Sequence, residues 1–130
     1  MAIMRPPAPR SFASDGFVAT VVGGEAQTTV VVSGELDLHS TSWFTAALEH
    51  AREAATDGLV VDLGRLTFLD STGIAALATA SRDAVSQGHE FSVRGACAQP
   101  RRVLEITGLL GRLEHGGPRH PAAQIFHEEI

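Results

Sequence analysis

Short apolar runs of β type alternate with stretches of helical periodicity through most of this sequence. Two β-type runs come first, Phe17 to Val22 and Thr28 to Ser33, and the turn signal Gly23-Gly24 comes after the first of them, as in a hairpin. Two more, Leu59 to Leu63 and Phe91 to Arg94, each lie between helical segments. Strands that alternate with helices need crossover connections and form parallel pairs. We therefore expect one small α/β domain, with a mixed, mostly parallel sheet of four to five strands and helices packed on it.

Three helices are predicted from apolar stripes and from residues that favour helix ends. The first is expected from Ser40, a good N-cap, to about Ala55. The second comes after Asp70-Ser71-Thr72-Gly73 and stops at Gln87-Gly88. The third has Pro100 in its first turn, where the missing N–H group would have no helical partner in any case.

The two ends of the chain have a different composition. Residues 1–15 are rich in Pro, Ala, Arg and Ser, and we expect them to form a disordered tail because proline blocks regular backbone pairing. The domain itself is expected over residues 16–115. Pro118 and Pro121 interrupt the C-terminal segment, so residues 116–130 are predicted to be a C-terminal tail or a short final helix.

Composition excludes several classes of partner. The formal net charge is −5, and scattered Arg residues on an acidic chain give no basic patch for nucleic acid or for an anionic membrane. Cys97 is the single cysteine, so no internal disulfide can form and a reducing compartment is the simplest setting. The first residues lack the apolar stretch of a secretory signal, and no apolar run reaches the roughly 20 residues of a membrane span. We expect a cytoplasmic monomer with no nucleic-acid partner and no membrane insertion.

Acidic and hydroxyl side chains lie in the loops that follow the predicted strands Thr28 to Ser33 and Leu59 to Leu63. Asp37 ends Gly34-Glu35-Leu36-Asp37, which leaves one strand toward a helix, and Asp70-Ser71-Thr72-Gly73 does the same after another strand. Sites in open α/β sheets gather beyond the carboxyl ends of strands, so parallel strands would place both aspartates at one edge. The two hydroxyl residues would lie at the N-cap or first turn of a helix. The N–H groups and partial positive charge there can accept a phosphate.

Other interpretations of Ser71 are simpler or use different chemistry. From the local residues alone, Ser71 is more readily a helix cap and Asp70 a turn former, because caps are far commoner than phosphorylation sites. A hydrolase would use Ser71 as its nucleophile, but the sequence lacks the Gly-x-Ser-x-Gly turn, and no motif places a histidine as the base. The six histidines include no His-x-x-x-His pair, so we expect no metal site and no cofactor.

The decisive pattern is a family resemblance. Gly34 to Asp37 before a helix, then Asp62 to Ile74, then Ile106 to Leu110, resembles the STAS domain. The sequence is most similar to the single-domain anti-sigma factor antagonists of bacteria, over about residues 17–115. Three motifs in order, each in the expected strand or helix, make the resemblance specific, although any one of them alone would be weak.

The resemblance implies a regulated binding protein and not an enzyme. In that family the unphosphorylated antagonist binds an anti-sigma factor that is also a serine kinase, and this frees a sigma factor. The kinase phosphorylates the hydroxyl residue after the motif Asp, which ends binding, and a serine phosphatase resets the protein. Carried over, the phosphoacceptor is Ser71, with Thr72 as runner-up. The implied partner-binding residues are Glu35, Asp37, His39, Asp70, Ser71, Thr72 and Gly73.

The same family leaves a second function open. It also includes regulatory domains of anion transporters and subunits of lipid transport systems, which often lack a phosphorylatable residue at the position of Ser71. A STAS subunit of a membrane transport system is therefore the alternative function, and a serine hydrolase is a less favoured one. The presence of Ser71 favours the sigma-regulation branch.

Overall fold

The computed structural model describes residues 9–24, 26–54 and 57–114. Its single sheet has the strand order β1-β2-β3-β4-β5. The strands are β1 (Arg10–Ser14), β2 (Phe17–Gly23), β3 (Gln27–Leu36), β4 (Gly58–Leu69) and β5 (Glu90–Arg94). The pairs β1–β2 and β2–β3 are antiparallel, and the pairs β3–β4 and β4–β5 are parallel. The predicted small α/β domain with a mixed sheet is confirmed, but the edge strand β1 adds a second antiparallel pair, so parallel pairs do not outnumber antiparallel ones as expected.

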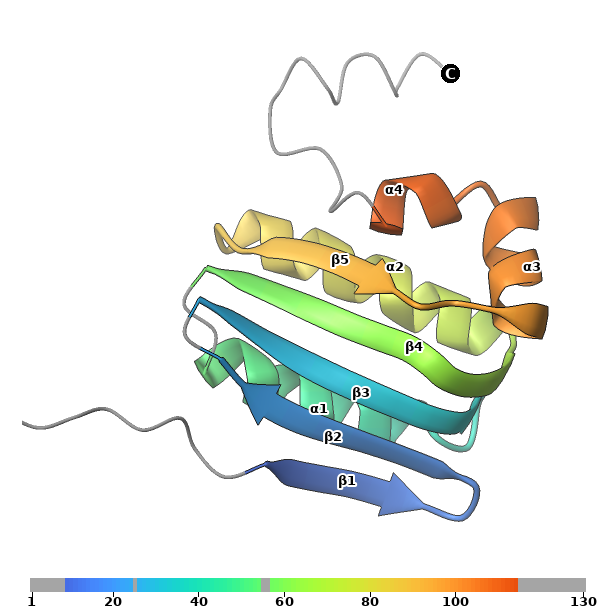
Figure 1. The fold of residues 1–130 in the computed structure, drawn as a ribbon, viewed down its shortest axis with the longest axis horizontal. Coiled ribbons are helices and arrows are strands. Elements are labelled where there is room, and N and C mark those ends of the chain that lie inside the picture. The colour runs from blue at the N-terminus through green and yellow to red at the C-terminus, as the bar shows by residue number, and fades with distance from the viewer. Residues whose placement is uncertain (1–8, 25, 55–56, 115–130) are drawn as a thin grey trace, which may run out of the picture.

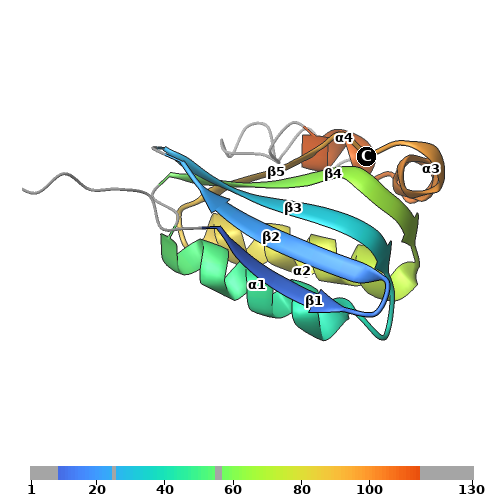
Figure 2. The same ribbon diagram turned by 60° about the horizontal axis from the view of Figure 1, so that its bottom comes forward.

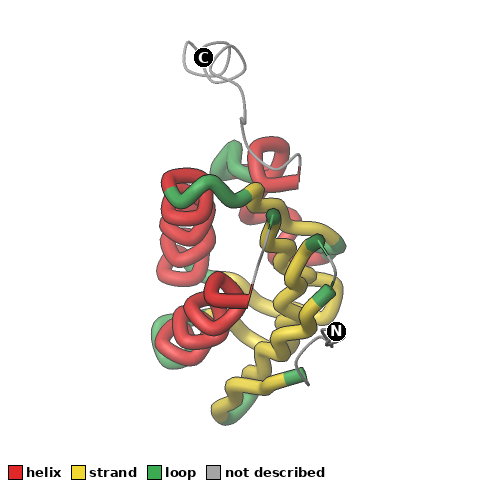
Figure 3. The backbone as a smooth tube through the Cα atoms, turned by 90° about the vertical axis from the view of Figure 1, so that its left-hand side faces the viewer, coloured by secondary structure: helices red, strands yellow, loops and turns green. Residues whose placement is uncertain are grey.

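Helices cover the two faces of this sheet unequally. The long helices α1 (Thr41–Ala54) and α2 (Ser71–Ser86) lie side by side on one face, and Figure 3 shows them together on one side of the strands. The short helices α3 (Ala98–Ile106) and α4 (Leu110–Glu114) lie on the other face, beside β4 and β5 (Figure 2). The opposite face of β1, β2 and β3 therefore carries no helix in the described part of the chain.

The core lies between the sheet and the layer formed by α1 and α2. On β2, Phe17, Ala19 and Val21 are buried while the alternate residues are more exposed, as expected for a strand with one covered face. On β4, Leu59 to Val61 is buried without interruption, because helices cover both faces there. Phe44 of α1 and Leu77 of α2 are fully buried against these strands. The burial pattern along each strand thus shows whether one or both of its faces are covered.

The predicted disordered tail through residue 15 is wrong for β1. Arg10–Ser14 pairs with β2, and Phe12 packs against the core with its ring centroid 5.8 Å from that of His50 on α1. Prolines lie just before this segment, but Arg10–Ser14 itself contains none and pairs with β2 along its whole length. Residues 1–8 and the tail or helix predicted at 116–130 lie outside the described residues.

Strand β4 is longer than its sequence pattern indicates. We expected a strand over Leu59 to Leu63 and a loop after it, but the strand continues to Leu69. Its register against β3 shifts at two places, which breaks the two-residue alternation of buried side chains. Leu63, Leu66 and Leu69 are buried at intervals of three instead. The extension carries the chain directly to Asp70.

Candidate functional site

The carboxyl ends of β3 and β4 form the edge that carries the candidate site (Figure 1). Leu36 and Leu69 are register partners at the ends of these parallel strands. The Asp70 N–H donates to the Leu36 carbonyl at 3.3 Å, which continues the pairing by one step. Asp37 and Asp70 therefore come after two adjacent strand ends, at a shared edge of the sheet, as the sequence predicts.

Asp37 organises the loop between β3 and α1. Its carboxylate Oδ1 accepts hydrogen bonds from the backbone N–H of His39 at 2.9 Å and of Ser40 at 3.1 Å. The Ser40 hydroxyl is buried; it accepts from the Asp37 N–H at 2.9 Å and donates to the Glu35 carbonyl at 2.8 Å. The side chains of Glu35 and His39 remain exposed. The loop therefore has a fixed shape that presents these two side chains to solvent.

Asp70, and not Ser71, is the N-cap of α2. Its backbone is extended, and its Oδ1 accepts from the Gly73 N–H at 2.9 Å. This is the hydrogen bond that an N-cap aspartate supplies to the first turn of a helix. Ser71 is then the first helical residue, and it is exposed. The structure therefore assigns the capping role, which the local residues suggested for Ser71, to its neighbour.

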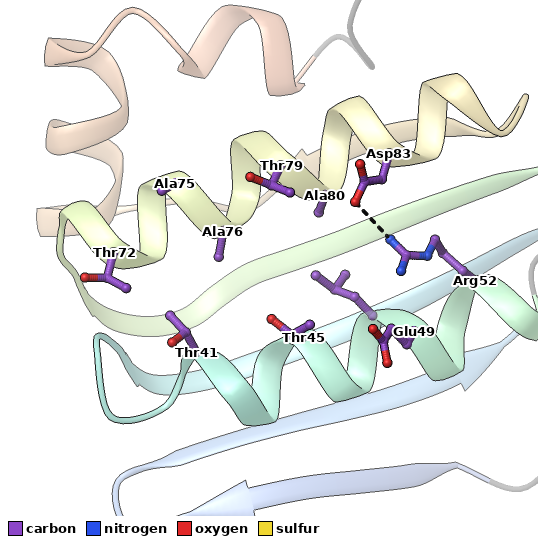
Figure 4. A pocket seen from close by; sticks show the side chains of 11 residues that line it. Thr41, Thr45, Glu49, Arg52, Thr72, Ala75, Ala76, Thr79, Ala80 and Asp83 are labelled. Atoms are coloured by element: carbon purple, nitrogen blue, oxygen red, sulfur yellow. Dashed lines mark ion pairs between the residues drawn. The ribbon is translucent and has the colours of Figure 1, made fainter.

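Thr72 lies in a groove and not on the open surface. It is half-buried and lines a groove of about 330 Å³ between α1 and α2, where it lies across from Thr41 (Figure 4). An ion pair between Arg52 and Asp83, at 3.8 Å, spans the two helices farther along this groove. Of the two adjacent hydroxyl residues, Ser71 is therefore the more accessible one.

Gly73 is buried beneath the site. A Cβ atom at this position would lie 2.6 Å from Leu69 Cδ1 and 2.8 Å from the Leu36 carbonyl oxygen. Only a residue without a side chain allows the first turn of α2 to pack this closely on both strand ends. We expected Gly73 on the partner-binding surface, but its burial gives it a role in packing that surface from below.

Two exposed apolar side chains next to these acidic residues were not identified from the sequence. Leu38 is the residue directly after Asp37 and is 67% exposed, and Phe68, the register partner of Glu35, is 39% exposed. Exposed apolar residues that adjoin polar ones are typical of protein-binding surfaces. Leu38 could have been identified from the sequence as an apolar residue in a largely polar loop. Phe68 gave none, because it lies in the part of β4 that was predicted to be a loop.

Two features are absent from the described residues. In that part of the chain, no group of three or more His, Cys, Asp or Glu side chains is placed to hold a metal ion. None of the helices described is long and apolar enough to cross a membrane.

Comparison with known proteins places the chain in a family. The family model described as "Mlab, STAS domain" matches residues 19–114. The chain belongs to the STAS domain family. This STAS domain is 29% identical over 80 residues to the anti-sigma-B factor antagonist of Staphylococcus aureus, an alignment that covers 62% of this chain and 74% of the relative. It is 28% identical over 97 residues to the anti-sigma-F factor antagonist RsfB of Mycobacterium tuberculosis, and this alignment covers 75% of this chain and 79% of that protein.

Solved structures agree with this assignment. A crystal structure of an anti-sigma factor antagonist from Mycobacterium paratuberculosis matches the STAS domain with a TM-score of 0.68 and 25% identity, over 88% of this chain and 96% of that one. The anti-sigma factor antagonist SpoIIAA in its unphosphorylated form matches with a TM-score of 0.63 over 86% of this chain and 98% of that one. At 18% identity, SpoIIAA supports the fold alone. The family resemblance drawn from the sequence motifs is confirmed.

Proposed function

We propose that this STAS domain is an anti-sigma factor antagonist whose binding is switched off by phosphorylation at Ser71. Unphosphorylated, it binds an anti-sigma factor that is also a serine kinase, and this releases a sigma factor. A serine phosphatase restores the binding form. The observation that carries the proposal is the exposed Ser71 hydroxyl, which lies in the first turn of α2 directly after the capping Asp70. The names of relatives that are similar in sequence support the same function.

The surface around Ser71 has the chemistry of a protein-docking site. The exposed side chains of Glu35, Leu38, His39 and Phe68 come from the two strand ends that precede α1 and α2. We name these four residues, together with Asp37, Asp70, Ser71 and Thr72, the switch surface. A combination of exposed apolar side chains and polar groups is typical of a protein interface. The half-buried Asp37 and Asp70 hold the loop between β3 and α1 and the first turn of α2 in shape.

Phosphorylation changes the charge of this surface at one point. The Ser71 oxygen forms a bond to the γ-phosphorus of ATP and gives up its proton to a base of the kinase. The bond between the γ-phosphorus and the bridging oxygen breaks, and ADP leaves with its electron pair. The product carries roughly −1.5 to −2 charge at pH 7. The Gly73 N–H, which would otherwise help to hold a phosphate at the helix start, already donates to Asp70 at 2.9 Å. The new phosphate therefore adds charge next to Asp70 and bulk to the docking surface, and both oppose docking.

Kinase labelling with site mapping tests this assignment. The purified protein is incubated with ATP and anti-sigma factor kinases encoded in the same genome, and its mass and modified residue are determined. We expect one added phosphate on the wild type and on Thr72→Val, and none on Ser71→Ala. Absence of phosphate on the wild type, or equal labelling of Ser71→Ala, would contradict the proposal.

A STAS subunit of a membrane transport system is the second candidate. The observation that favours it is the description of the matching family model, which names Mlab together with the STAS domain. Affinity purification of the tagged protein from its own cells separates the two functions. Recovery of an anti-sigma factor kinase supports the switch, whereas recovery of membrane transport components with no kinase supports the second candidate.

A further inference from the structure

One edge of β4 is left without a strand just before the switch surface. Strand β5 ends at Arg94 and pairs with β4 only from Gly58 to Asp62. The rest of β4, up to Leu69, extends beyond this pairing on the β5 side. Backbone groups at such an edge need another partner or water.

The side chain of Gln99 closes this edge at its last residue. Its Nε2 donates to the Leu69 carbonyl at 2.9 Å, and its Oε1 accepts from the Leu69 N–H at 2.9 Å. One primary amide thus supplies both the donor and the acceptor that a neighbouring strand would provide. Leu69 immediately precedes Asp70, so this pair of hydrogen bonds lies two residues from Ser71 in the sequence.

The start of α3 is shaped to bring Gln99 to this position. Ala98, the preceding residue, has a φ of +52°, a left-handed conformation that residues with a Cβ atom rarely adopt. Pro100, the next residue, is buried. Backbone conformations of this kind persist only where the surrounding structure holds them in place. Here the amide pair and the buried proline hold the first turn of α3 against the end of β4.

We propose that Gln99 is the positioning residue of the switch surface, and this inference rests on the function proposed above. The segment from Leu69 to Ser71 is held from two sides. On one side the Leu36 carbonyl accepts from the Asp70 N–H at 3.3 Å, and on the other Gln99 pairs with Leu69. A segment that is ordered before binding loses less entropy when a partner docks. Gln99 therefore raises the affinity for the anti-sigma factor without contacting it.

The test is Gln99→Glu, with Gln87→Glu as its matched control. The first variant keeps the acceptor for the Leu69 N–H but replaces the NH₂ donor by a carboxylate that faces the Leu69 carbonyl. The control makes the same change at an exposed position beyond the opposite end of α2. We measure amide exchange at Leu69 by NMR, affinity for the anti-sigma factor by calorimetry, and the kinase KM values for the antagonist and for ATP.

The expected result is specific to a positioning role. In the Gln99→Glu variant, the Leu69 amide proton exchanges with solvent about tenfold faster or more, and the affinity for the anti-sigma factor falls about tenfold. The KM of the kinase for this variant rises, while its KM for ATP stays unchanged. Gln87→Glu matches the wild type in all four measurements. If Gln99→Glu does not fold, Gln99→Asn, which is uncharged and one methylene shorter, makes the same comparison.

Failure of this inference is distinct from failure of the proposed function. If the wild type binds and is phosphorylated while Gln99→Glu has wild-type affinity and KM, the positioning role is refuted and the switch stands. If the wild type neither binds an anti-sigma factor nor accepts phosphate at Ser71, the proposed function fails and the role of Gln99 in it fails too.

Discussion

Replacing Gly73 by alanine tests how the first turn of α2 is held on the sheet. The added Cβ atom would meet Leu69 Cδ1 at 2.6 Å and the Leu36 carbonyl oxygen at 2.8 Å. Carbon atoms in contact normally lie about 3.5–4.0 Å apart. The overlap of roughly 1 Å therefore has to be relieved by movement, and both neighbours are constrained. Leu69 is fully buried, and the Leu36 carbonyl accepts the hydrogen bond from Asp70.

The expected cost is the balance of two opposing effects. Overpacking of a well-packed core costs about 1–3 kcal/mol. Alanine is favoured over glycine within a helix by up to about 1 kcal/mol, which offsets part of this. We therefore expect Gly73→Ala to lower the free energy of unfolding by roughly 1–2 kcal/mol. In a domain of this size that corresponds to a melting temperature about 5–15 °C lower.

Thermal and urea denaturation measure this change, with Gly111→Ala as the control. Gly111 lies in α4, and a Cβ atom there would have no neighbour within 4 Å among the described residues. The control is expected to be neutral or slightly stabilising, because it gains helix propensity without a clash. If Gly73→Ala were as stable as the wild type, the close packing of α2 on the strand ends would be refuted.

Three further changes probe the site in different ways. Ser40→Ala removes the buried hydroxyl that pairs with the Asp37 N–H, and we expect a loss of about 1–3 kcal/mol by urea denaturation; wild-type stability would contradict the network. Arg52→Gln breaks the ion pair with Asp83 at 3.8 Å, and because the Asp83 side chain is half exposed the melting temperature should change by no more than a few degrees; a larger drop would mean that this pair holds the two helices together. Leu38→Ser should leave stability unchanged and weaken binding to the anti-sigma factor about tenfold; calorimetry showing wild-type affinity would remove Leu38 from the interface.

The order of the elements from β2 to α3 was predictable because each of these arises from a local pattern. The β-branched run Thr28 to Ser33 and the nearly continuous apolar run after Asp57-Gly58 predict strands, the second of them covered on both faces, and both strands are found. The shared edge of Asp37 and Asp70 is then a consequence of the parallel pairing of β3 and β4. Local periodicity was sufficient to predict an element wherever its side chains face the core at the regular spacing of a strand, every second residue, or of a helix, every third or fourth residue.

The remaining features depend on contacts between residues far apart in the sequence. The shifts in register between β3 and β4 concealed the end of β4, because they replace the two-residue alternation with a spacing of three. The amide of Gln99 pairs with Leu69, 30 residues earlier, and no local pattern marks a side chain that substitutes for a strand. The burial of Gly73 likewise requires knowing that Leu36 lies beneath it.

The affinity of the fully phosphorylated protein for its anti-sigma factor tests the central claim most directly. Wild-type protein, its phosphorylated form, Ser71→Ala and Ser71→Asp are titrated into the same partner by calorimetry. We expect tight binding by the wild type and Ser71→Ala, weaker binding by Ser71→Asp, and no measurable binding by the phosphorylated form. Equal affinities for the phosphorylated and unphosphorylated proteins would show that the charge on Ser71 does not control docking.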